Sequence, residues 1–215
     1  MKIVLQIVLT IVIVVLGYFT YKSVYGPVEF NKAKQKRYAE VIEKLQDIRD
    51  SEIAHREVTG KFVGSFDSLV RFIDTAEFVL TQRKDTTYLD LEYKKRYGVD
   101  EYVEDVVIDT LGYVSIKDSL FKGTDRYKTM MNIPYTDNKK FDLEAGMLDK
   151  DGTMIPVFEA KVNKSDILSD LDQDLVVQEK QTVAVDGVNG AFIKVGSMTE
   201  VNTSGNWPKN YGDKD

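Results

Sequence analysis

The sequence predicts an α+β fold, in which an N-terminal transmembrane helix leads into an amphipathic helix packed on a mostly antiparallel sheet. Three observations predict it: an apolar run over residues 3–16, an apolar stripe at helical spacing that begins at Tyr38, and a turn at Asp149-Lys150-Asp151-Gly152, which contains an Asp-Gly pair, between two hydrophobic segments. The 215 residues divide into four parts: a transmembrane anchor (1–25), a juxtamembrane amphipathic helix (26–60), an α+β soluble domain (61–200) and an irregular C-terminal tail (201–215).

Composition restricts the classes of function. With 43% hydrophobic and 30% charged residues, the chain can bury an ordinary globular core. Its formal net charge of −6 argues against a nucleic-acid partner, which would require a basic surface. The absence of cysteine excludes disulfides, thiolate nucleophiles and cysteine-ligated zinc.

The first segment is long and apolar enough to cross a bilayer. No charged residue lies between Lys2 and Lys22, and a helix rising about 1.5 Å per residue over this stretch spans the roughly 30 Å hydrocarbon core. A cleaved signal peptide and a buried pair of core strands are the alternatives. We expect the helix to stay attached, because no small-x-small cleavage site follows it. Aromatic residues at its far end are expected at the membrane–water interface: Tyr18, Phe19, Tyr21 and Tyr25.

Two features predict opposite orientations of this anchor. Basic residues follow the span at positions 22, 32, 34, 36 and 37, which favours a cytoplasmic C-terminal domain. A very short N-terminal tail before a long soluble domain is instead typical of an anchor that exports its C-terminus. We expect a single-pass inner-membrane protein with a periplasmic C-terminal domain, and the cytoplasmic orientation is the alternative.

A second helix is predicted from about residue 30 to residue 58, after an interruption at Gly26-Pro27 and before a stop at Gly60. Its apolar stripe either packs on the chain's own sheet or forms a seam with a partner. The candidate partner-binding residues are Tyr38, Val41, Leu45 and Ile48.

The rest of the chain predicts a short helix after Ser65 and then mainly strands. Four strands are expected first, over residues 78–80, 88–93, 106–108 and 113–116. A hairpin of 141–148 with 154–162, a short helix over 165–171 and a strand over 191–198 are expected to follow.

The segment KLQDIRDSEIAHREVTGKFVGSFDSLVRFI, residues 44–73, resembles type IV pilins and type II secretion pseudopilins. In that family a long N-terminal helix is followed by a stretch with Gly, an aromatic residue, a small residue and Leu, here Gly60, Phe62, Ser65 and Leu69, and then by a sheet. The resemblance covers the first third of the chain and implies a pilin-like envelope protein.

The resemblance does not extend to prepilin processing. The family's leader ends in Gly, followed by Phe or Met and by Glu at the fifth mature position, whereas this chain begins Met1-Lys2-Ile3 and has no acid in the span. Two later segments, IPYTDNKKFDLE and VGSMTEVNTSGNW, resemble parts of uncharacterised single-pass membrane proteins of Bacteroidota.

The sequence offers little catalytic chemistry. The one histidine, His55, has no organised partner in the sequence and is expected at the surface or boundary of its helix. Residues 170, 172 and 174 alternate as calcium ligands do, but Leu175 and Gln181 replace the Gly and Glu that the loop requires. The acids between residues 100 and 109 are expected along a solvated sheet edge. We therefore expect no catalytic residue, no cofactor and no metal.

These observations predict a non-enzymatic, membrane-anchored structural or assembly subunit of a bacterial envelope complex of the secretion, motility or pilus-like kind. Its expected partners are the lipid bilayer and other envelope proteins or further copies of itself. The alternative is a membrane-tethered binding domain for a small ligand or cell-wall component, which predicts an apolar pocket with converging polar groups. An envelope hydrolase would need two carboxylates about 5–10 Å apart in a cleft.

Overall fold

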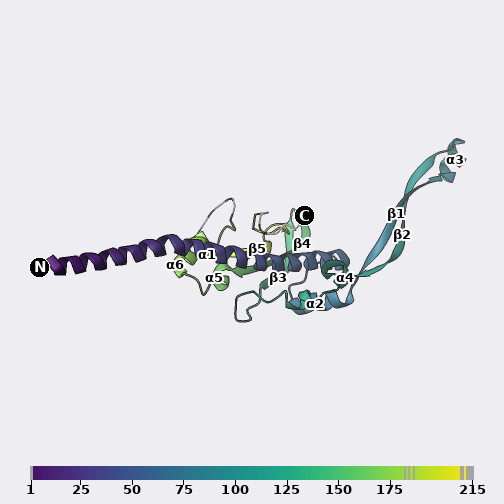
Figure 1. Ribbon diagram of the computed structural model, residues 1–215. Helices are drawn as coiled ribbons and strands as arrows, with labels where there is room; N and C mark the ends of the chain where they lie inside the picture. Colours follow the sequence, from purple (N-terminus) through teal and green to yellow (C-terminus); the bar gives the residue numbers. More distant parts are fainter. Residues whose placement is uncertain (1, 182, 184, 186, 209–210, 212–215) are drawn as a thin grey trace.

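The computed structural model describes residues 2–181, 183, 185, 187–208 and 211. It contains a long N-terminal helix, a three-stranded sheet, a two-stranded ribbon and several short helices (Figure 1). This combination of helix and antiparallel sheet confirms the α+β class.

Helix α1 (Lys2–Thr59) is continuous, with Pro27 inside it. The predicted interruption at Gly26-Pro27 is therefore wrong. Proline has no N–H to bond the carbonyl of Ser23 one turn earlier, and it costs about 3 kcal/mol in a helix interior. The helix continues because an apolar run precedes the proline and a segment packed in the core follows it, so one missing hydrogen bond does not end it.

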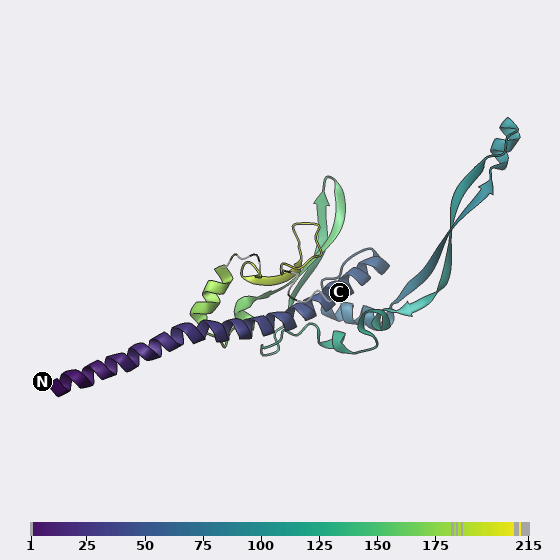
Figure 2. The same cartoon turned by 45° about the horizontal axis from the view of Figure 1, so that its top comes forward.

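The second half of α1 packs on a three-stranded antiparallel sheet with the strand order β3 (Asp142–Lys150), β4 (Thr153–Asn163) and β5 (Phe192–Gly196) (Figures 1 and 2). Apolar side chains from both layers meet there in one cluster. Full burial of each large apolar side chain contributes about 1.5–3 kcal/mol. The fully buried residues of this contact include Val41, Leu45, Ile48, Phe158, Ala160, Ile193 and Val195.

The four candidate partner residues belong to this core. Tyr38 is 1% exposed, and Val41, Leu45 and Ile48 are 0% exposed. Their stripe packs on the chain's own sheet, so it presents no surface to a partner. The spacing predicted an apolar face correctly, but the sheet of the same chain covers that face.

The β3–β4 hairpin forms where the sequence predicted it, although β3 continues to Lys150 and the loop is therefore shorter than the predicted turn over residues 149–152. Lys150 pairs with Thr153 around a two-residue loop, in which Asp151 has φ 55° and Gly152 has φ 80°. Both values suit the type I′ turn that matches the twist of antiparallel strands. The backbone N–H of Gly152 also donates to Oδ1 of Asp149 at 3.0 Å.

The described part of the C-terminal tail, residues 201–208 and 211, forms no helix or extended strand but is hydrogen-bonded to the sheet. The rest of the predicted irregular tail lies outside the described residues. Oδ1 of Asn206 accepts from the backbone N–H of Lys194 at 2.9 Å, and its Nδ2 donates to the carbonyl of Phe192 at 2.9 Å. Gly196 ends β5 with φ +75°, where an added Cβ would lie 2.2 Å from the carbonyl oxygen of Phe158. Only glycine fits there, because both the backbone conformation and the close approach exclude a side chain.

Short helices cover the remaining edges of the core. The sequence predicted the first of them after Ser65, and it predicted the fourth near its observed place but about four residues too long. It missed the second, the third and the last. They are α2 (Phe66–Thr75), α4 (Ile116–Phe121), the 3-10 helix η1 (Arg126–Thr129), α5 (Lys164–Ile167) and α6 (Gln173–Gln181).

A two-stranded ribbon stands away from the domain at the end opposite the N-terminus (Figures 1 and 2). Strand β1 (Glu77–Leu89) pairs with β2 (Tyr102–Ser115) along its whole length. At about 3.3 Å per residue the ribbon is roughly 43 Å long. At its tip lies helix α3 (Leu91–Tyr97), so the expected strand over residues 88–93 ends before Leu91. Asp90 starts α3 by accepting from two backbone N–H groups. We call β1, α3 and β2 together the arm.

Leu45→Ala is expected to destabilise the soluble domain by about 2–5 kcal/mol, because it leaves a cavity between α1 and the sheet. Urea denaturation of the full chain in mild detergent, followed by circular dichroism, measures this. The matched control is Met147→Ala on β3, whose side chain is 52% exposed. Equal stability of the two variants would contradict the assignment of Leu45 to the core.

Candidate functional site

The N-terminal half of α1 carries a long, mostly apolar surface. Residues 2–25 are all exposed. An 18-residue window of the helix has a mean hydropathy of 2.6, and none of it is buried. The helix is long and apolar enough to cross a membrane, which fits a single-pass membrane protein. Signal sequences share this length and composition.

The two threonine side chains of this segment bond to the backbone of their own helix. The hydroxyl of Thr10 donates to the carbonyl of Gln6 at 2.9 Å, and that of Thr20 donates to the carbonyl of Leu16 at 2.8 Å. A hydroxyl without a partner would be costly in hydrocarbon, where no water replaces the bond. Both threonine hydroxyls are therefore satisfied by backbone carbonyls of the same helix.

The predicted interfacial aromatic residues lie together at the end of this segment, and all four are exposed. Tyr21 and Tyr25 stack with ring centroids 4.3 Å apart, and Tyr18 and Phe19 meet edge to face at 6.0 Å. Phe30 is the first buried residue of α1. It follows Lys22 by eight residues, or about 12 Å of helix. The position of the aromatic rings in a headgroup layer stays a prediction.

A buried charged cluster fixes α1 to the C-terminal part of the domain. Lys164 is 0% exposed, and its Nζ donates to Oε1 of Glu179 at 3.1 Å, to the Glu179 carbonyl at 3.1 Å and to the Val188 carbonyl at 2.6 Å. Glu179 also binds Nζ of Lys34 at 2.9 Å and accepts from the hydroxyl of Tyr38 at 3.3 Å. Burial lowers the pKa of Lys164, and Glu179 opposes that shift. Burial, and then the charge of Glu179, raises the pKa of Tyr38.

A second polar contact is made by Arg37, which lies between Lys34 and Tyr38 on the same helix. The guanidinium of Arg37 binds both carboxylate oxygens of Asp170, and Nη1 donates to the carbonyl of Ile167 at 2.7 Å. The hydrogen bond to Asp170 raises the pKa of Arg37 and lowers that of the Asp170 carboxyl. Tyr135 stacks beneath the guanidinium, 4.8 Å from the ring centroid. Two of the five basic residues after the span, Lys34 and Arg37, thus hold the domain together.

Glu52 is a buried acid at the far end of α1, and it is 0% exposed. Its Oε2 accepts from the backbone N–H of Val63 at 2.9 Å, while Oε1 has no hydrogen-bond partner in the described part of the chain. Burial raises the pKa of this carboxyl to about 8, although the Val63 N–H acts in the opposite direction. The carboxyl is therefore mostly protonated at neutral pH, and it joins α1 to the loop before α2.

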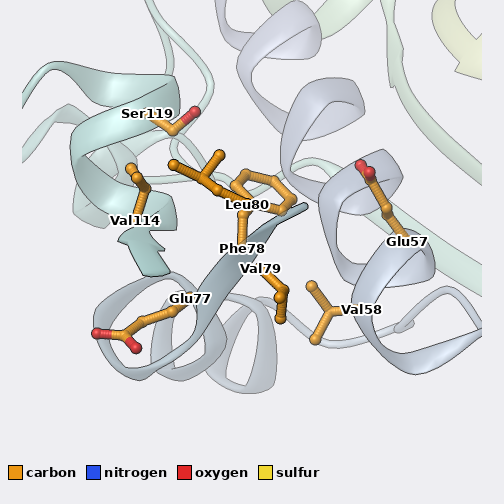
Figure 3. Close-up of a pocket in the computed structure, with 8 residues that line it drawn as sticks. All are labelled: Glu57, Val58, Glu77, Phe78, Val79, Leu80, Val114 and Ser119. Carbon is orange, nitrogen blue, oxygen red and sulfur yellow. The ribbon is translucent and has the colours of Figure 1, made fainter. Parts of the chain in front are cut away.

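A shallow hollow of about 530 Å³ lies where the arm leaves the domain. Figure 3 shows that Phe78, Leu80 and Val114 supply much of its lining, and that the carboxylates of Glu57 and Glu77 point in different directions. Its polar groups do not converge on a common point, as a small-molecule site would require. The hollow therefore gives no support to the binding-domain alternative.

The residues considered for catalytic or metal chemistry are engaged in local structure. Nδ1 of His55 lies 2.6 Å from the carbonyl of Lys61, and its ring packs on Phe72 with centroids 4.7 Å apart. Asp170 binds Arg37, as described above, and Oδ1 of Asp172 accepts from the N–H of Asp174 at the start of α6. Within the described residues no group of three His, Cys, Asp or Glu side chains is placed to hold a metal.

The second group of acids lies on the arm. Asp100 pairs with Lys94 at 2.7 Å beside α3, and the others follow β2 at exposed positions: Glu101, Glu104, Asp105 and Asp109. They occupy an open ribbon rather than the cleft that glycosidic chemistry needs. The expected acidic strand edge is thus present, although on a protruding arm that the sequence did not predict.

Comparison with family models, with curated proteins and with solved structures finds no match to this chain. Function must therefore be inferred from the exposed half of α1, its attachment to the domain, and the arm.

Lys164→Met is expected to destabilise the domain by about 3–5 kcal/mol, because it removes the fully buried cation that pairs with the Glu179 carboxylate and leaves only the partly exposed Lys34 beside it. The double change Lys164→Met with Glu179→Leu removes both charges and should recover at least half of that loss. Urea denaturation of the full chain in detergent measures both, with the exposed Lys150→Met as control. A double variant no more stable than the single one would contradict the pairing.

Glu52 is expected to make stability fall as pH rises. Below its unfolded pKa of 4.5 both states are protonated, and the group has no effect. Between 4.5 and about 8 only the unfolded chain releases the proton, so the free energy of unfolding falls by about 1.4 kcal/mol per pH unit. Above that range the loss is constant.

Glu52→Gln should remove this slope. Urea midpoints of both proteins near about pH 5 and about pH 8 measure it. The control is Glu57→Gln, an exposed position on the same helix, which should keep the wild-type slope. Parallel pH profiles for wild type and Glu52→Gln would refute the burial of an ionisable carboxyl there.

Proposed function

We propose that this protein is a membrane-anchored, non-enzymatic structural or assembly subunit of a bacterial envelope complex of the secretion, motility or pilus-like kind. One observation carries the proposal: a single helix, α1, is bare and apolar over residues 2–25 and is built into the domain core from Phe30 onward. The same rod thus serves as anchor and as scaffold.

The energetics of α1 support a bilayer as the first partner. Each Leu, Ile, Phe or Val at the centre of a membrane helix favours insertion by about 0.3–0.6 kcal/mol. The segment contains many such residues, and each exposes about half or more of its surface to solvent. Leaving them in water would forgo that gain, and the domain shields none of the segment.

The way the domain is attached supports a mechanical role. Polar contacts of Lys34, Arg37 and Tyr38 join the start of the packed half to α5, α6 and the loop between them. Further along, Asp47 binds the guanidinium of Arg126 at 3.0 Å. The helix is therefore fixed to the domain at several points along its length, as a load-transmitting element needs. A protruding helix half ahead of an antiparallel sheet also agrees with the pilin and pseudopilin resemblance.

The proposed location is the inner membrane, with the domain in the periplasm. Two of the five basic residues that argued for a cytoplasmic domain, Lys34 and Arg37, are engaged in contacts within the domain. They therefore have a structural reason to be present, which leaves fewer charges to set the orientation. The remaining partners of the proposal are other envelope proteins or further copies of this chain.

Two arginines in the middle of the span are expected to abolish membrane retention. In Leu9→Arg with Ile13→Arg, each arginine adds about 2.5–3.5 kcal/mol to the cost of insertion. Cell fractionation followed by alkaline carbonate extraction should leave the wild type and the control Leu9→Ala with Ile13→Ala in the membrane pellet. The arginine variant should be lost from it. Recovery of wild-type protein as soluble material that starts beyond Tyr25 would overturn the proposal.

A further inference from the structure

The arm lacks a partner for most of its surface. Its two strands form a sheet of their own, so each has one outer edge without a neighbouring strand in the described chain. A two-stranded ribbon is marginally stable in water, and a long free edge pairs readily with another strand. Natural proteins protect such edges. Strands β1 and β2 pair with each other over 13 positions, so each free outer edge is long.

Apolar side chains are exposed on both faces of the arm. Successive residues of a strand point to opposite faces. Val79, Ile108 and Tyr113 lie on one face, and they are 52%, 66% and 65% exposed. Tyr88 and Val107 lie on the other face, at 53% and 42%. A ribbon that remained alone would leave all of these in contact with water.

We propose that the arms of neighbouring copies join edge to edge, with β1 of one copy against β2 of the next. The inference rests on the proposed function in one respect: anchors in a common bilayer hold the copies parallel, with their arms at the same height. In that arrangement β1 of one copy and β2 of its neighbour run in opposite directions. The contact therefore extends the antiparallel ladder that already exists within each arm.

The charges of the two edges are complementary. Strand β2 contains no Lys or Arg and three acids, Glu104, Asp105 and Asp109, so it is an acidic edge. Two β2 edges would repel each other. Strand β1 is neutral overall, because Glu77 and Asp85 balance Arg83 and Lys84. Arg83 pairs with Asp85 at 3.3 Å, and the exposed Lys84 is the cation that β1 offers to a neighbouring edge. Contact of unlike edges is therefore favoured over contact of like edges.

The pairing register of β1 with β2 shows where the opposite charges of two neighbouring arms would meet. Lys84 lies opposite Val107 within the arm. Residues two positions apart on a strand share a face, so Asp105 and Asp109 lie on the same face as Lys84. At equal height, Lys84 of one copy lies between Asp105 and Asp109 of the neighbouring β2, within the roughly 7–8 Å reach of diagonal cross-strand pairs.

Contact between unlike edges leaves a free edge at each end of any pair. It therefore continues as a row or closes as a ring, and a closed ring leaves no strand edge exposed. The arms would then form a sheet that joins several copies at the end of the domain farthest from the anchor (Figure 1).

The test uses charge reversal in the full chain, purified in mild detergent. Variant A is Lys84→Glu, and variant B is Asp105→Lys with Asp109→Lys. Each alone places like charges at every contact between copies, so the dissociation constant measured by light scattering should rise at least tenfold above wild type. Lys150→Glu, on the exposed β3–β4 hairpin, is the control and should leave the constant unchanged.

Mixing A with B separates contacts between chains from contacts within a chain. In the mixture the carboxylate introduced at position 84 of A meets the two introduced lysines of B, and Lys84 of B meets Asp105 and Asp109 of A. Alternating oligomers should therefore form with an affinity close to wild type, although each arm still carries its own internal repulsion.

A monomeric wild type, variants that assemble normally, or a mixture that fails to recover would each overturn the inference. Circular dichroism of each variant checks that the arm and domain remain folded. The fractionation experiment tests the anchor independently. Loss of arm pairing with normal membrane retention thus removes this inference and leaves the proposed function standing.

Discussion

Burial of one face of α1 under β4 and β5 is the contact on which the structure depends. It fixes the direction of the helix relative to the sheet, and so the direction in which the bare apolar half leaves the domain. The same contact also places the start of α2 and the base of the arm near the other end of α1. Anchor and arm therefore emerge at opposite ends of one packed element (Figure 2).

Polar contacts refine this packing rather than create it. Lys164 and Glu179 lie in the interior, where desolvation costs each charge several kcal/mol and only close, well-bonded pairing offsets that cost. The Lys164 ammonium donates three hydrogen bonds, two to backbone carbonyls and one to the Glu179 carboxylate. Such a cluster tolerates few alternative positions of α6. It therefore contributes to a single geometry at the end of the domain that faces the anchor.

Sequence reasoning succeeded where a local signal and the final environment agree. The apolar run, the stripe at helical spacing, the stop at Gly60 and the Asp151-Gly152 turn are all set by neighbouring residues. It failed where distant residues decide. Pro27 usually breaks a helix, but here the flanking segments are held strongly enough to carry the helix through it.

The arm and the buried cluster could not be predicted for the same reason. Nothing local distinguishes a strand that joins the central sheet from one that leaves with a single partner, because both show β-branched and aromatic residues. The pairing of Lys164 with Glu179 and with Lys34 joins segments far apart in the chain. Even the stripe that begins at Tyr38 needed the structure to show which layer covers it.

Pro27 has a mechanical consequence for a molecule shaped in this way. The carbonyl of Ser23 lacks the proline N–H that would complete the helical ladder, at a point just outside the packed domain. A sideways force on the distant arm is transmitted through the domain to α1. The resulting torque is greatest where α1 leaves the proposed membrane, which is close to Pro27. The rod should flex at this pivot, so that the domain can tilt as a unit without disturbing its interior.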